Sequence, residues 1–217
     1  MNKQWHSNMM KRRKWFYTLM ALMLLIVGAA ACWYLQPENS TAGTPEEKEY
    51  DQLQRSGKWQ QIIDMDKQNP TQSLACHKVV LLAKYRLGLA SAMVVYECLA
   101  DSREVLTSPT AALMMSDVYM QLGMTNMAQR AAFEAMVSES DVKKNERSLR
   151  RLTETALITG HYELALKYIA IVEENFNSSK WVQTMKPLAE HPELIKAHPV
   201  FNKLRQNYEK SEDQFFL

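Results

Sequence analysis

The chain has 217 residues, of which 47% are hydrophobic, with 26 basic and 24 acidic side chains and a net charge of +2. This near balance lacks the basic excess typical of proteins that bind nucleic acid, so we expect no nucleic-acid partner. The length is sufficient for one domain with a sizeable hydrophobic core.

The first predicted element is a membrane-spanning helix over residues 15–35. This segment has no charged side chain, and at 1.5 Å per residue its helix matches a bilayer core of roughly 30 Å. Residues 1–14 carry five basic side chains and no acidic one, which favours the cytoplasmic side for that segment. We therefore expect a single-pass membrane protein with its N-terminus in the cytoplasm and its folded part on the other side of the membrane.

A second interpretation of the same segment is lipoprotein processing at Cys32. The small residues 28–31 stand directly before this cysteine, as they do in bacterial signals that are cleaved before an acylated cysteine. The apolar run continues after it, through residues 33–35, which favours a retained signal anchor. In both cases the rest of the chain is tethered to a membrane.

After a short linker at residues 36–46, rich in Ser, Thr, Pro and Gly, a glycine recurs between helix-like apolar patterns. It stands at Gly57, Gly88, Gly123 and Gly160, spaced by 31, 35 and 37 residues. A glycine at a helix end takes the left-handed conformation at little cost. This spacing predicts an all-α domain over residues 47–210, an α-solenoid of antiparallel helix hairpins.

The end of the domain carries two His-Pro pairs, at residues 191–192 and 198–199. Proline is favoured in the first turn of a helix, so each pair predicts a helix start. Residues 197–205 are expected to form the final helix, before a C-terminal tail at residues 211–217.

No catalytic motif is found in the sequence. Four of the six glycines are assigned to turns and the other two to the membrane segment and the linker, which leaves none for a phosphate-binding loop or a nucleophile elbow. We predict no catalytic residue, metal site or cofactor. The alternative is an envelope enzyme, or an accessory subunit of one, acting on cell-wall or glycan material.

The repeat motif is clearest in Tyr119, Leu122, Gly123 and Ala135, where the chain resembles tetratricopeptide repeats. This resemblance implies a scaffold that binds a protein or peptide partner. Residues 122–136 and 149–169 also resemble the C-terminal repeat region of a bacterial membrane-protein family with no assigned function. That second resemblance, which covers about residues 47–217, implies a location in the bacterial inner membrane, with the repeat domain in the periplasm, and a helical-repeat fold, and it leaves the function open.

The expected partner-binding surface is a basic strip on one helix, extended by two polar residues of the helix before it. Its members are Lys143, Lys144, Arg147, Arg150, Arg151, Asn126 and Arg130. Arginine forks can hold the carboxylates of a peptide or of an acidic partner. The alternative is a solvated face whose charges pair with one another, for example Arg150 with Glu154.

Two cysteines flank one of the predicted turns. Cys76 lies twelve residues before Gly88, and Cys98 lies ten residues after it. Positions equidistant from a hairpin turn face each other, so a disulfide bond between them is a hypothesis for an oxidising compartment. The alternative is a pair of buried thiols in the core.

Overall fold

The computed structural model describes residues 43–99, 106–139, 141 and 145–210, together with Met20 and Met23. The chain divides into two compact units, Met1–Ser40 and Thr41–Leu217, and every helix named below belongs to the second. Apart from the two methionines, the segments predicted at residues 1–14, 15–35 and 211–217 and most of the linker lie outside the described residues. Within the described residues, no helix has both the length and the apolar character needed to cross a membrane.

The described part of the second unit consists of eleven helices and no strand, which confirms the predicted all-α class. In chain order they are α2 (Pro45–Arg55), α3 (Trp59–Gln68), α4 (Leu74–Arg86), α5 (Ala92–Leu99), α6 (Pro109–Gln121), α7 (Thr125–Ser138), α8 (Glu146–Thr159), α9 (Tyr162–Asn175), α10 (Ser179–Glu190), α11 (Glu193–Ala197) and α12 (Pro199–Lys210).

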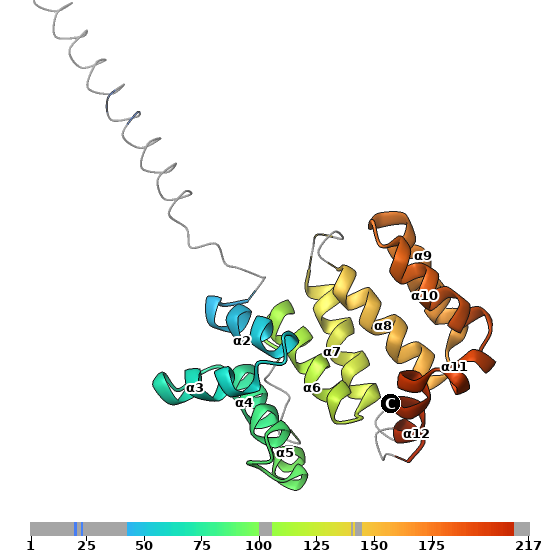
Figure 1. Ribbon diagram of the computed structural model, residues 1–217. Helices are drawn as coiled ribbons and strands as arrows, with labels where there is room; N and C mark the ends of the chain where they lie inside the picture. The colour runs from blue at the N-terminus through green and yellow to red at the C-terminus, as the bar shows by residue number, and fades with distance from the viewer. Residues whose placement is uncertain are drawn as a thin grey trace, which may run out of the picture. The chain divides into compact units, whose positions relative to one another are not determined.

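Neighbouring helices pair into hairpins, and the hairpins stack on one another. The pairs are α2 with α3, α4 with α5, α6 with α7, and α8 with α9. The first two hairpins meet through α3 and α4, the second and third through α4 and α6, and the third and fourth through α7 and α8. After α10 and α11, helix α12 turns back and packs on α8 (Figure 1).

The four recurring glycines form the turns that the sequence predicts. Gly57, Gly88, Gly123 and Gly160 all have positive φ angles, between 65° and 87°. At the end of α8, Gly160 has a φ of 87°, and the next residue, His161, donates its backbone N–H to the carbonyl oxygen of Ala156 at 2.8 Å. A side chain at this position would strain the backbone, because residues other than glycine rarely adopt that conformation.

The carboxylate of Glu47 joins the N-termini of three helices. It accepts hydrogen bonds from the backbone N–H of Thr44 (3.0 Å), which caps α2, from the Ser73 hydroxyl (3.2 Å) at the start of α4, and from the Ser108 hydroxyl (2.9 Å), which caps α6. Glu47 is 3% exposed. Its negative charge lies at the positive ends of three helix dipoles, so α2 is held against both α4 and α6.

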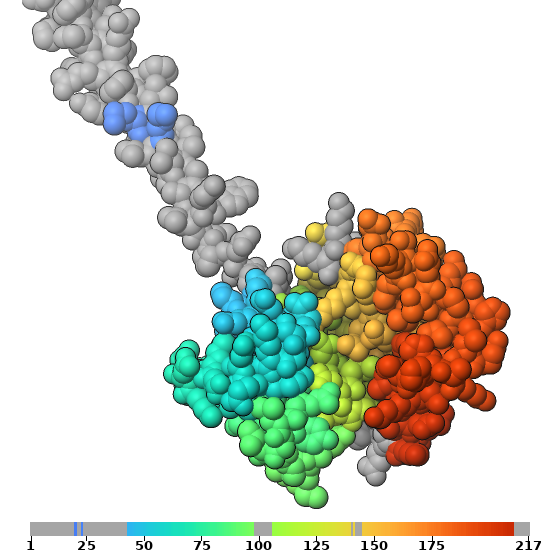
Figure 2. Space-filling view, viewed as in Figure 1, coloured from blue at the N-terminus to red at the C-terminus, as the bar shows by residue number. Residues whose placement is uncertain are grey.

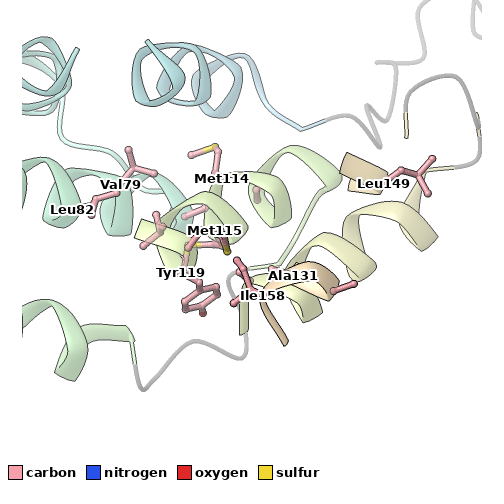
Figure 3. Close-up of a cluster of buried hydrophobic side chains, with 14 of the residues drawn as sticks. Val79, Leu82, Met114, Met115, Tyr119, Ala131, Leu149 and Ile158 are labelled. Carbon is pink, nitrogen blue, oxygen red and sulfur yellow. The ribbon is translucent and has the colours of Figure 1, made fainter. Parts of the chain in front are cut away.

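The hydrophobic core runs through the hairpin helices. Figure 3 shows part of it, with Val79 and Leu82 from α4, Met114, Met115 and Tyr119 from α6, Ala131 from α7, and Leu149 and Ile158 from α8. Helix α7 buries mainly alanines (Ala128, Ala131, Ala132 and Ala135). Small side chains let two helices approach closely, which accounts for the tight pairing of α6 and α7.

Helix α12 is fixed to α8 through Arg205. The guanidinium donates from Nε to the carbonyl oxygen of Ile158 (3.2 Å) and from Nη2 to that of Leu157 (2.5 Å). These carbonyls belong to the last turn of α8, where no intrahelical donor is available. The same guanidinium lies 5.5 Å above the ring of Tyr162. These contacts fix α12 as a wall beside α8.

Candidate functional site

A groove of about 1190 Å³ lies in the second unit, lined by the ends of α2, α4, α6, α8 and α12 and by Tyr96 of α5. Figure 2 shows a recess at this place, between the blue-to-green helices and the red C-terminal helices, with yellow-green atoms at its floor. Six basic side chains line it (Arg55, Arg86, Arg147, Arg150, Arg151 and Lys203) and two acidic ones (Asp117 and Glu146). Its apolar lining comes from Tyr85, Tyr96, Met120, Leu122, Val200 and Leu204.

At the floor of the groove, Arg147 of α8 is held between two carboxylates from other helices. Its Nη1 lies 2.8 Å from Oδ1 of Asp51 on α2, and its Nη2 lies 2.6 Å from Oδ2 of Asp117 on α6. Burial opposes the charged form, but the two carboxylates more than compensate and raise the pKa of Arg147. The ion pairs therefore connect α2, α6 and α8.

Arg151, one turn further along α8, uses the other oxygen of the same aspartate. Its Nη2 lies 2.5 Å from Oδ1 of Asp117, and its Nη1 lies 2.8 Å from Oε2 of Glu154. Burial raises the pKa of the Glu154 carboxyl above its ordinary value, and the charge of Asp117 raises it further, while Arg151 and Arg150 lower it. The two arginines and their carboxylates form one continuous network.

Arg150 faces α10 instead. It pairs with Glu146 one turn earlier and donates from Nη2 to the Ser178 hydroxyl at 2.8 Å. Its guanidinium lies 5.1 Å from the ring centre of Trp181 on α10. The predicted internal pair between Arg150 and Glu154 is therefore replaced by two others, because Arg150 takes Glu146 and Arg151 takes Glu154.

Two further basic side chains, Arg86 and Lys203, lie on the walls of the groove. Arg86, at the end of α4, donates from Nε and Nη2 to Oε1 of Gln121 at 2.9 and 2.7 Å, and its guanidinium lies 5.9 Å from the ring centre of Trp59. Lys203 is exposed on α12. Tyr96 of α5 donates its hydroxyl to the carbonyl oxygen of Leu122 at 2.6 Å, which joins α5 to the turn after α6.

The structure brings together three of the seven residues of the predicted surface: Arg147, Arg150 and Arg151 line the groove. Asn126 is 6% exposed, and Arg130 is exposed on α7, but neither lines the groove. The basic strip therefore does not extend along α7. Lys143 and Lys144 lie outside the described residues.

The cysteine predictions fall partly outside the described residues. Cys76 is fully buried and has no disulfide partner among the residues whose side chains the structure describes, and burial raises the pKa of its thiol to about 12. The side chain of Cys98 and the whole of Cys32 lie outside the part of the chain that the structure describes. The disulfide bond and the lipid attachment both stay predictions.

Several groove residues were missed because they come from different helices. The repeat register contains a signal for them, since the position two residues before the turn glycine is Arg55, Arg86 and Gln121 in the first three hairpins, and all three line the groove. The position six residues before it is Asp51, Asp117 and Glu154 in the first, third and fourth hairpins. These three carboxylates form the ion pairs with Arg147 and Arg151.

Comparison with known proteins gives a family and no individual relative. No match is found among curated proteins or among solved structures. The match to the family begins at residue 3, so it includes the N-terminal segment as well as the helical hairpins. Because the family of unknown function DUF6057 matches residues 3–217, nearly the whole chain, the protein belongs to that family.

Proposed function

We propose that the chain is a membrane-anchored scaffold of the periplasm, whose tetratricopeptide-like hairpins bind a protein or peptide partner in the groove. The groove is the observation that carries this proposal. Sites for small molecules have volumes of about 300–1,000 Å³ and enclose most of their ligand. A groove of about 1190 Å³, open to solvent and lined by several helices, suits a segment of polypeptide better.

The hairpin arrangement supports the tetratricopeptide-like part of the proposal. The first helices of the hairpins (α2, α4, α6 and α8) all contribute to the groove. Two residues that carry the motif, Tyr119 and Ala135, are buried, and two others, Leu122 and Gly123, lie at the turn between α6 and α7. Stacked repeats of this kind present extended concave surfaces to partners.

The membrane anchor and the periplasmic location rest on the N-terminal sequence. Its uncharged run at residues 15–35 follows five basic residues, a pattern typical of a helix that leaves its N-terminus in the cytoplasm. The single-pass topology in the bacterial inner membrane then places the groove in the periplasm. Attachment through an acylated Cys32 would leave the groove in the same compartment.

A bulky substitution inside the groove tests this function without depending on the charge of the partner. Val200 is 57% exposed and lines the groove, while Val137 is 56% exposed on α7 and does not line it. We expect crosslinking and affinity purification of the tagged full-length chain from native membranes to recover a partner with wild type and Val137→Trp. The partner should be lost with Val200→Trp, because the indole fills part of the groove.

Equal recovery of the partner by both tryptophan variants would place binding on another face and overturn the groove as the binding site. Failure to enrich a partner with any form of the chain would count against the scaffold itself. Replacing Arg147, Arg150 and Arg151 together is a poorer test, since it removes the ion pairs that connect α2, α6 and α8. Loss of the partner would then not separate binding from folding.

A further inference from the structure

We propose that the groove binds an acidic peptide segment, held between Arg86 on one wall and Lys203 on the other. This inference rests on the proposed function, because it names the chemistry of the partner that the groove would take. It moves the recognition of acidic groups away from the arginines of α8 and onto the two walls.

The arginines of α8 are already neutralised by the protein. Each has a carboxylate partner: Arg147 has Asp51 and Asp117, Arg151 has Asp117 and Glu154, and Arg150 has Glu146. A fourth cation, Arg55, lies 3.1 Å from Oδ2 of Asp51. Each of these four arginines therefore already has a carboxylate partner within the protein.

Arg86 and Lys203 are the two groove cations left over. Among the described residues, no carboxylate lies within 4.0 Å of either charge, in contrast to the four arginines of the floor. Among the residues that the structure describes, the only hydrogen-bond partner of the Arg86 guanidinium is the neutral amide of Gln121, whose Oε1 accepts from Nε and Nη2. A guanidinium has five N–H donors, so donors remain for a carboxylate on a partner.

The lining of the groove includes apolar side chains on the same helices as the two cations. On α12, Val200 and Leu204 lie on either side of Lys203 in the sequence, and on α4, Tyr85 directly precedes Arg86. Two carboxylates with an apolar side chain between them would therefore complement the groove. A nucleic acid would require a continuous basic surface, which the carboxylates of Asp117 and Glu146 interrupt.

Three labelled synthetic peptides test this proposal on the purified full-length protein in detergent. In the first, glutamates alternate with leucines; in the second, glutamines replace the glutamates; in the third, lysines replace them. Fluorescence anisotropy should show that the glutamate peptide binds and that the other two bind about tenfold more weakly or not at all. Its affinity should also fall as salt is added.

Substitutions on the walls locate the binding. Arg86→Gln and Lys203→Gln should each weaken the glutamate peptide by about tenfold. The matched controls Arg130→Gln and Lys167→Gln, at exposed positions outside the groove, should leave it unchanged. The double variant Arg86→Glu and Lys203→Glu should prefer the lysine peptide, a gain that a misfolded protein could not produce.

Equal binding of the glutamate and glutamine peptides, no binding of either, or equal effects of the wall and control substitutions would each overturn this inference. The proposed function would survive these results if Val200→Trp still abolished capture of the natural partner. If Val200→Trp left that capture intact, the proposed function itself would fail. The two proposals are thus tested separately.

Discussion

The charged residues of the groove differ in what surrounds them rather than in type. Arg147 is 29% exposed at its side chain and is fixed by two carboxylates, whereas Arg86 is exposed and is bonded to a neutral amide. An ion pair that is partly removed from water holds both partners in one geometry, and breaking it leaves a charge uncompensated. At the scale of the residue, removing Arg147 would therefore leave Asp51 and Asp117 without their partner, whereas Arg86 has no carboxylate partner among the described residues.

The buried thiol of Cys76 gives a prediction about reactivity. Only the thiolate is nucleophilic, and burial raises the pKa of Cys76 to about 12, with a hydrogen bond from Ser73 acting in the opposite direction. At about pH 8 we expect alkylation in the native protein to be at least about a thousandfold slower than for an exposed cysteine. Mass spectrometry of alkylated peptides measures this directly.

The same experiment also tests the disulfide hypothesis. After unfolding without a reductant, a free Cys76 is alkylated at once, whereas a thiol bridged to Cys98 requires reduction first.

The raised pKa of Cys76 also has a consequence for stability. Above the pKa of the unfolded thiol and up to about pH 12, the folded state keeps a proton that the unfolded state loses, so this group makes the fold less stable as the pH rises. Rapid alkylation of the native protein would contradict the raised pKa of Cys76, and with it both the slow reactivity and the predicted loss of stability at high pH.

At the scale of the helix, the hydrogen bonds of Glu47 define how three elements meet. Replacing it by alanine would leave the Ser73 and Ser108 hydroxyls and the Thr44 N–H without their acceptor. We expect Glu47→Ala to lower the free energy of unfolding by about 2–3 kcal/mol, as measured by urea denaturation. Glu49→Ala, an exposed position on the same helix, should change it by less than about 0.5 kcal/mol. Equal effects of the two changes would mean that the three helix starts are held by other contacts.

Much of the helix pattern can be predicted from the sequence, because each hairpin turn needs a residue with positive φ. The glycine spacing therefore placed the turn between α2 and α3 and the turn between α8 and α9 at Gly57 and Gly160. Helix α10 was not predicted. It contains Pro187, and a proline normally indicates the end of a helix rather than its interior.

The site was harder to predict, since its contacts depend on helices far apart in the chain. A helix allows Arg150 to pair with Glu146 or with Glu154, each four residues away. Ser178, in the loop before α10, and Trp181, on α10, contact Arg150 and hold it on the side of Glu146. No local sequence pattern indicates which of the two glutamates pairs with Arg150. The sequence signal for the groove lies at the positions two and six residues before the turn glycines. It becomes visible only when the hairpins are aligned on those glycines.

At the scale of the whole domain, the stacking makes stability uneven. Helices α6, α7 and α8 pack on one another, and Met114 and Met115 of α6 are fully buried. Helix α5 packs mainly on α4 and leaves Met93 70% exposed. In stacked repeats, each unit is stabilised by its neighbours, so the helix with the least packing should open first.

Hydrogen exchange followed by mass spectrometry measures this order. Amides of α5 should exchange well before those of α6 and α8 under native conditions, because opening α5 exposes little of the core. Amides of α3 should be intermediate, since α3 packs on both α2 and α4 and buries Ile62 and Ile63. Simultaneous exchange of all these helices would show that the domain opens as one cooperative unit.

The arrangement around Glu47 has a mechanical consequence. Gly43 and Thr44 are the first described residues of the domain, so a force transmitted along the N-terminal segment would reach α2 through them. Because Glu47 bonds to Thr44, Ser73 and Ser108 at once, the force is divided among the starts of α2, α4 and α6. Helix α2 would then resist being peeled away, and the groove that it borders would keep its shape under tension.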